Sequence, residues 1–200
     1  MMASLYAGVL RVITGARATW MASEPSIAPT IYFANHTSNL DAAILWAALP
    51  NAVRDRTRPV AAQDYWDSSA IRRFMAVRVF NALLIERKNV TARSNPIPTI
   101  VEALDAGASI IIFPEGGRSP GPEPGPFKSG IYHIAKQRPQ IPLTPVFLEN
   151  FNRILPKGEF LPVPLLATVI VGAPIQLAEN ETKQIFVERA RLAVWNLHRL

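Results

Sequence analysis

The chain is organised around the stretch Thr30-Ile31-Tyr32-Phe33-Ala34-Asn35-His36-Thr37-Ser38-Asn39-Leu40-Asp41. Its first five residues are rich in β-branched and aromatic side chains, which predicts a buried strand. An amphipathic run from Leu40 to Leu49 follows and stops at Pro50, which predicts a helix. His36 should therefore lie on the turn between a strand and a helix N-terminus, with Asp41 about one helical turn further on.

Two interpretations of this turn are open from the stretch alone. In the first, the Asp41 carboxylate accepts a hydrogen bond from one imidazole nitrogen of His36 and leaves the other nitrogen free to act as a general base. In the second, Ser38-x-x-Asp41 is a helix capping pattern with Ser38 as the N-cap, and His36 is only a turn residue.

Length and composition narrow the class of protein. Two hundred residues suit one domain with a sizeable core, and 49% hydrophobic with 18% charged residues is typical of a globular protein. The absence of cysteine excludes disulfides, thiolate zinc sites and a cysteine nucleophile. The three histidines share no metal-binding spacing, so no metal site is expected.

Further apolar runs alternate with helical patterns. The run 109–113 is apolar throughout, which predicts a central strand covered on both faces. Other strands are predicted at 60–62, 83–85, 143–148 and 167–171. This alternation predicts an α/β fold: a single domain with a mainly parallel central sheet flanked by helices.

Residues 1–21 are apolar but are interrupted by Arg11 and Arg17, so they do not form a predicted membrane span. They predict an N-terminal amphipathic helix in the membrane interface, with Trp20 at headgroup level and the arginines towards anionic lipid. The alternative is an ordinary helix docked on the core.

The net charge of +6 is uneven: residues 1–93 carry +5 and residues 94–200 carry +1. A basic face suits nucleic acid, anionic lipid or an acidic carrier. No RNA- or DNA-binding signature accompanies the charge, so no nucleic-acid partner is expected.

A second polar stretch follows the strand at 109–113, namely Pro114-Glu115-Gly116-Gly117-Arg118-Ser119. Its glycines let backbone N–H groups approach an anion, and Arg118 can bind a phosphate with two hydrogen bonds. Arg87, at the end of the strand 83–85, is well placed to meet the same anion, unless it is a surface residue paired with Glu86.

The segment Gly117-Arg118-Ser119-Pro120-Gly121 matches the G-x-S-x-G nucleophile elbow of serine hydrolases. That motif requires the serine between a strand and an immediately following helix. Ser119 lies six residues past its strand and leads into prolines, and no Asp follows it in the chain. A serine hydrolase is therefore not favoured.

Together these stretches resemble the glycerophospholipid acyltransferase family, best known for lysophosphatidate acyltransferases. The resemblance covers residues 30 to about 175, with His36-x4-Asp41 and Glu115 separated by the family's spacing. The family's four blocks appear in order: Asn35–Asp41, Ala82–Arg87, Phe113–Ser119 and Ile141–Val146. A Phe-Lys-Ser-Gly segment, Phe127–Gly130, follows the third block.

The resemblance implies transfer of a fatty acyl group from acyl-CoA or acyl carrier protein to a lysophospholipid hydroxyl, with 1-acyl-glycerol-3-phosphate as the expected acceptor and phosphatidate as the product. His36 would be the general base and Asp41 its orienting partner. The implied substrate-binding residues are Arg87, Glu115, Gly116, Gly117, Arg118, Ser119 and Lys128.

No cofactor or metal is implied, because the acyl donor is itself a substrate. The chain is expected to divide into a membrane-associating helix at 1–21 and an acyltransferase domain at 22–200. The protein is expected to lie peripherally or monotopically on the cytoplasmic face of a membrane. Two alternatives remain: an acyltransferase-like membrane-binding protein that acts on another lysolipid or lacks catalysis, and a basic phosphate- or nucleic-acid-binding domain.

Two residues depart from the family pattern. Asn81 stands where the second block often begins with glycine, and Gly117 stands where the third block usually has threonine. Both lie in regions that the family uses for the acceptor, so the departures leave the identity of the acceptor open.

Overall fold

The computed structural model describes residues 2–21, 24–86, 95–149 and 168–199. Within these residues the chain forms a seven-stranded sheet in the order β1-β7-β6-β2-β5-β3-β4, in which only the β6–β7 pair is antiparallel. The strands are β1 (Arg17–Trp20), β2 (Ile31–Ala34), β3 (Thr57–Ala62), β4 (Leu83–Ile85), β5 (Ser109–Ile112), β6 (Leu143–Glu149) and β7 (Thr168–Val171).

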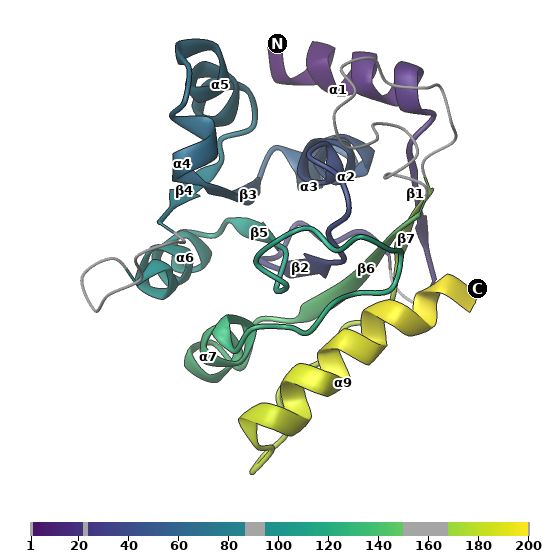
Figure 1. Ribbon diagram of the computed structural model, residues 1–200, viewed down its shortest axis with the longest axis vertical. Helices are drawn as coiled ribbons and strands as arrows, with labels where there is room; N and C mark the ends of the chain where they lie inside the picture. Colours follow the sequence, from purple (N-terminus) through teal and green to yellow (C-terminus); the bar gives the residue numbers. More distant parts are fainter. Residues whose placement is uncertain (1, 22–23, 87–94, 150–167, 200) are drawn as a thin grey trace.

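Helices cover both faces of the sheet (Figure 1). One face carries α1 (Met2–Thr14), α2 (Asp41–Ala48) and the π-helical turn η1 (Met75–Val79). The other face carries α6 (Pro96–Asp105), α7 (Gly130–Gln137) and α9 (Lys183–Trp195). The remaining short helices are α3 (Asn51–Arg54), α4 (Gln63–Trp66), α5 (Ala70–Phe74) and η2 (Asn196–Arg199).

The alternation of side chains along β2 explains why both faces must be covered. Tyr32 and Ala34 pack in the cluster under α1 and α2, while Ile31 and Phe33 pack in the cluster under α6, α7 and α9. All four residues are buried, because successive side chains of a strand point to opposite faces. The predicted α/β domain with a mainly parallel sheet is therefore confirmed, and β5 is buried throughout as predicted.

One strand was not predicted from the sequence. β1 has the sequence Arg-Ala-Thr-Trp and pairs in parallel with β7, whose first residue is Thr168. A four-residue edge strand with two exposed side chains has little periodicity of its own, and its partner lies far away in the chain. The predicted boundary after residue 21 therefore follows a strand of the sheet and not the end of a helix.

The N-terminal helix is present but shorter than predicted, and it packs on α2. Arg11 donates hydrogen bonds to the carbonyl oxygens of Ala47 and Leu49 at the end of α2, so its predicted direction towards lipid is wrong. Burial, together with the charge of Arg54, lowers the pKa of Arg11.

Trp20 does not belong to the N-terminal helix, and its place at headgroup level stays a prediction. It lies in β1 and packs edge-to-face on Tyr32, with 6.4 Å between ring centroids. No helix among the described residues is both long and apolar enough to cross a bilayer.

Candidate active site

The sheet order brings the two polar stretches together. β2 and β5 are adjacent and parallel, so the loops that follow them lie at the same edge of the sheet. The backbone N–H of Ser119 donates to the carbonyl oxygen of His36 at 2.8 Å, and the N–H of His36 donates to Glu115 Oε1 at 2.7 Å. His36 and Glu115, 79 positions apart in the chain, thus belong to one site.

The predicted dyad is present. His36 Nδ1 lies 2.9 Å from Asp41 Oδ2. A carboxylate can only accept, so the proton belongs on Nδ1 and Nε2 is left as an acceptor. The Asp41 side chain is fully buried, whereas 24% of the His36 side chain is exposed. The imidazole is therefore held from inside the protein and open on its Nε2 side.

The same carboxylate also holds the turn. Asp41 Oδ2 accepts the backbone N–H groups of Thr37 at 2.6 Å and Ser38 at 2.8 Å. The helix boundary differs from the capping interpretation: α2 begins at Asp41, and its N-cap position is Leu40, which makes no side-chain cap bond. Two hydrogen bonds of the capping pattern are nevertheless present: the Ser38 hydroxyl accepts the Leu40 N–H at 3.3 Å, and Asp41 Oδ2 accepts the Ser38 N–H. They coexist with the dyad.

Two side chains that the sequence did not single out support the turn that carries His36. The ring of Phe113 stacks on the imidazole, with 4.4 Å between centroids and 26° between planes. Asn35, fully buried, exchanges two hydrogen bonds with the backbone of Leu148 in β6, at 2.8 and 3.0 Å. Both residues belong to the motifs quoted above, but their partners became visible only in the fold.

Glu115 organises the second loop. Its Oε1 accepts from the His36 backbone, and its Oε2 accepts from the Ser119 hydroxyl and from the Gly125 N–H, the latter at 3.0 Å. Both oxygens of the buried Glu115 carboxylate are therefore bonded within the protein. The hydroxyl of Ser119 is bonded to a carboxylate and not to a histidine, which agrees with its rejection as a nucleophile.

Gly116 and Lys128 approach each other closely. The φ of Gly116 is +69°, a left-handed conformation that favours glycine. A Cβ at this position would lie 2.5 Å from Lys128 Nζ. The backbone N–H of Lys128 donates to the carbonyl oxygen of Pro114 at 2.8 Å, which ties Lys128 to the same loop.

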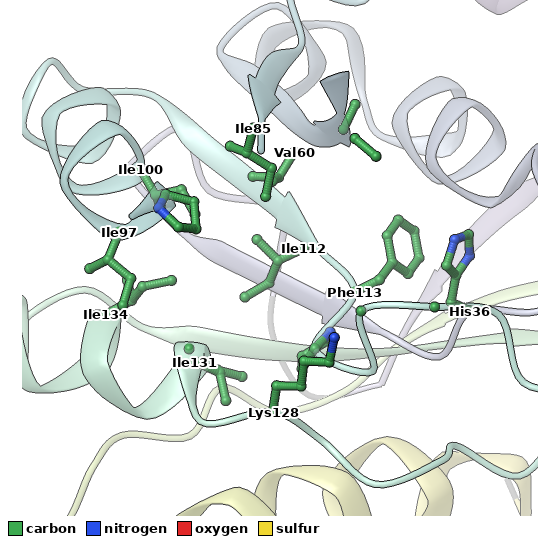
Figure 2. Close-up of a pocket in the computed structure, with 17 residues that line it drawn as sticks. His36, Val60, Ile85, Ile97, Ile100, Ile112, Phe113, Lys128, Ile131 and Ile134 are labelled. Carbon is green, nitrogen blue, oxygen red and sulfur yellow. The ribbon is translucent and has the colours of Figure 1, made fainter. Parts of the chain in front are cut away.

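Two pockets meet at His36. The first has a volume of about 230 Å³ and is lined mainly by aliphatic side chains. Figure 2 shows His36 and Phe113 at one end of it and Ile97, Ile100 and Ile134 at the other, with Lys128 also on its lining. An apolar pocket with a few polar groups at one end suits a ligand that carries a hydrocarbon chain.

The second pocket, of about 150 Å³, shares His36 and Phe113 with the first. It is lined by Arg118 and by the aromatic residues Tyr65, Trp66 and Phe80. The structure thus places Arg118 and Lys128 at different pockets. Arg87, the remaining predicted phosphate ligand, lies outside the described residues.

The departure at Asn81 has a conformational explanation. Asn81 has a φ of +49°, in the left-handed region that glycine and asparagine tolerate best. Its carbonyl oxygen accepts a hydrogen bond from Arg58 Nε at 2.9 Å. Asn81 therefore satisfies the backbone requirement that a glycine would meet.

Comparison with known proteins gives the family of this chain. Residues 21–149 match the Acyltransferase family, and the chain belongs to that family.

Among its relatives, 1-acyl-sn-glycerol-3-phosphate acyltransferase alpha of Mus musculus is 28% identical over 68% of this chain and 45% of its own length. The 1-acyl-sn-glycerol-3-phosphate acyltransferase of Limnanthes alba is 30% identical over 76% of this chain and 52% of its own. The chain spans about half the length of these curated relatives.

A solved structure has the same fold. The crystal structure of the 1-acyl-sn-glycerophosphate (LPA) acyltransferase PlsC from Thermotoga maritima matches with a TM-score of 0.73 at 20% identity, covering 98% of this chain and 77% of that one.

Proposed function

We propose that this protein transfers a fatty acyl group from acyl-CoA or acyl carrier protein to the free hydroxyl of 1-acyl-glycerol-3-phosphate, which yields phosphatidate for phospholipid synthesis. The observation that carries the proposal is the His36–Asp41 pair, whose open Nε2 lies where an apolar pocket meets an arginine-lined one. The names of the related proteins support the choice of acceptor.

In the proposed reaction, His36 Nε2 takes the proton of the acceptor hydroxyl as its oxygen attacks the thioester carbonyl carbon. Asp41 stabilises the imidazolium that forms. The new C–O ester bond replaces the C–S bond, and the departing thiolate receives the proton from His36. No enzyme nucleophile is needed, which fits a chain without cysteine.

The substrates divide between the two pockets. The aliphatic pocket suits the acyl chain of the donor, because burying hydrocarbon contributes roughly 0.8 kcal/mol per methylene. The acceptor phosphate is assigned to Arg118 and the N–H of Gly117, with Arg87 as a further ligand. The N–H of Gly116 donates to the carbonyl oxygen of Phe113 at 3.0 Å, and Lys128 lines the aliphatic pocket, so neither is assigned to the phosphate. Glu115 and Ser119 shape this loop through their mutual hydrogen bond.

The outer face of α1 supports peripheral binding to the cytoplasmic face of a membrane. Leu5, Val9 and Val12 are 69%, 47% and 85% exposed, whereas Ala7 on the opposite side of the helix is buried. Such a helix can lie in the headgroup region with its apolar side in lipid.

The test is a thiol-release assay with long-chain acyl-CoA and a panel of lysolipids, with products identified by mass spectrometry. We expect phosphatidate from lysophosphatidate and no turnover by His36→Ala, whose fold is checked by its melting temperature. A wild-type protein that releases no thiol with any acyl-CoA or acyl carrier protein would refute the acyltransferase assignment. Product from a different lysolipid alone would correct the acceptor.

A further inference from the structure

Exposed apolar side chains are concentrated on two elements. Among the described residues, nine of the thirteen large hydrophobic side chains that are exposed belong to α1 or to the continuous segment formed by α5 and η1. Single exposed apolar residues are normal, but such a concentration marks an interaction surface. The four others are spread over the molecule: Met21, Ile27, Ile185 and Leu192.

The apolar stripe on α5 and η1 faces outward. Ile71, Phe74 and Val77 recur every three residues and are 77%, 48% and 44% exposed. Ala76 and Val79, on the other side of the segment, are buried. These three apolar side chains therefore do not pack on the core formed by the described residues and are available to contact a partner.

Positive charge flanks the stripe. Residues 70–79 include Arg72, Arg73 and Arg78 and contain no acidic residue. Arg73 pairs with Asp67 at 2.6 Å, and Arg72 lies over the ring of Tyr65. All three arginines are exposed, so an apolar stripe and a cationic border occur on one short segment.

This stripe lies next to the outer face of α1. Tyr6 of α1 meets Phe80, the residue after η1, edge-to-face at 6.5 Å, and α1 also contacts η1. Figure 1 shows α1 and α5 at the same end of the molecule, with α9 on the far side of the sheet. A planar partner that touches one helix is thus positioned to touch the other.

We propose that α5 and η1 form a second membrane-docking element, which inserts Ile71, Phe74 and Val77 into the interface of an anionic bilayer beside α1. The inference rests on the proposed membrane function and deepens it. Apolar side chains bordered by arginines match the hydrocarbon boundary and the anionic headgroups of such a surface.

Docking on both elements has a consequence for the acceptor. The arginine-lined pocket is bounded by Tyr65 and Trp66 of α4 and by Phe80, and the chain joins these residues to α5 and η1 over short distances. With α5 on the bilayer, this pocket opens close to the lipid surface. An acceptor lysolipid then reaches His36 from the membrane without crossing water.

The test is vesicle flotation of the full chain on phosphatidylcholine vesicles with about one third phosphatidylglycerol. The variant carries Ile71→Ser and Phe74→Ser. The matched control carries Ile185→Ser and Leu192→Ser on α9, where the side chains are 59% and 39% exposed. We expect the vesicle partition coefficient of the first variant to be at least roughly ten-fold lower than that of wild type. The control should float normally, with unchanged melting temperatures in both.

Two results overturn the inference. One is wild-type flotation of the α5 variant; if that variant also reacts more slowly with acyl carrier protein thioesters, the surface is assigned to an acidic carrier. The other is an equal loss of flotation in the α9 control. Turnover of a water-soluble short-chain acyl-CoA and lysophosphatidate is measured separately, so a failure of the acyltransferase assignment is distinct from a failure of docking.

Discussion

Replacing Asp41 with asparagine separates catalysis from helix capping. Asp41 Oδ2 accepts two backbone N–H groups as well as His36 Nδ1–H. Those two N–H groups require an acceptor, so in Asp41→Asn the new amide oxygen must occupy the Oδ2 position and the new NH₂ group must face away. The variant therefore keeps the His36 tautomer with its proton on Nδ1 and loses the negative charge. It also places the new NH₂ group at the Oδ1 position, which is buried and has no hydrogen-bond partner.

The expected loss of rate follows from that charge. An imidazolium and a carboxylate whose charges lie about 4 Å apart interact by about 4 kcal/mol at an effective dielectric constant of about 20. At about 1.4 kcal/mol per factor of ten, turnover should fall by about 10³-fold. The two backbone hydrogen bonds to Oδ2 become neutral and weaken by about 1 kcal/mol each. For a chain of this size these two bonds alone should lower the melting temperature by about 4–8 °C, and the buried NH₂ group without a partner should lower it further.

The assay measures thiol release and the melting temperature of Asp41→Asn together, with the exposed Asp55→Asn as a matched control. A folded Asp41→Asn protein that turns over within about ten-fold of wild type refutes the catalytic dyad, because the charge would then contribute less than about 1.4 kcal/mol. In that outcome the carboxylate is a turn-holding group only.

Three further expectations follow from single contacts. Arg118→Ala should raise the KM for lysophosphatidate by about 10–100-fold, since a charge-assisted bond contributes about 1.5–3 kcal/mol; an unchanged KM in steady-state kinetics means that the phosphate binds elsewhere. Asn35→Ala leaves the backbone N–H and C=O of Leu148 without partners, so the free energy of unfolding should fall by about 2–6 kcal/mol, measured with denaturant. A fall of less than about 1 kcal/mol would mean that these two hydrogen bonds do not stabilise the fold. Arg189 holds the pKa of the Glu181 carboxyl below its ordinary value. The stability that this pair adds is present above about pH 4.3 and is lost as the pH falls through the lowered pKa, so the difference in melting temperature between wild type and Glu181→Gln should shrink in acid; a pH-independent difference would contradict it.

Local contacts made the dyad predictable. His36 and Asp41 are five positions apart on a strand–turn–helix whose type follows from side-chain periodicity, so their hydrogen bond is almost determined by the chain itself. The strand at 109–112 was predictable for the same reason, because an unbroken run of isoleucines suits only a buried position. The start of the helix was less predictable. Ser38 fits a capping pattern, which would begin the helix at residue 39, but α2 begins at Asp41, whose side chain bonds both His36 and the Ser38 N–H.

The segment formed by α5 and η1 shows where periodicity stops being informative. The spacing of Ile71 and Phe74 predicts a helix with an apolar face. It does not show whether that face is turned to the core or away from it. Only the burial of Ala76 and Val79 on the side towards the sheet turns Ile71 and Phe74 outward. Arg11 shows the converse, because a charge expected to face lipid satisfies the end of α2.

The sequence by itself determined the family motifs, the α/β class and the pairing of His36 with Asp41, because these depend on residue types at short spacing. The tertiary structure alone decided that Glu115 holds the backbone of His36, that Phe113 stacks on its ring, and that two pockets meet there. The physical reason is the order of the strands. Periodicity shows that a strand is buried but not which strand lies beside it, and the site exists because β2 and β5 are neighbours.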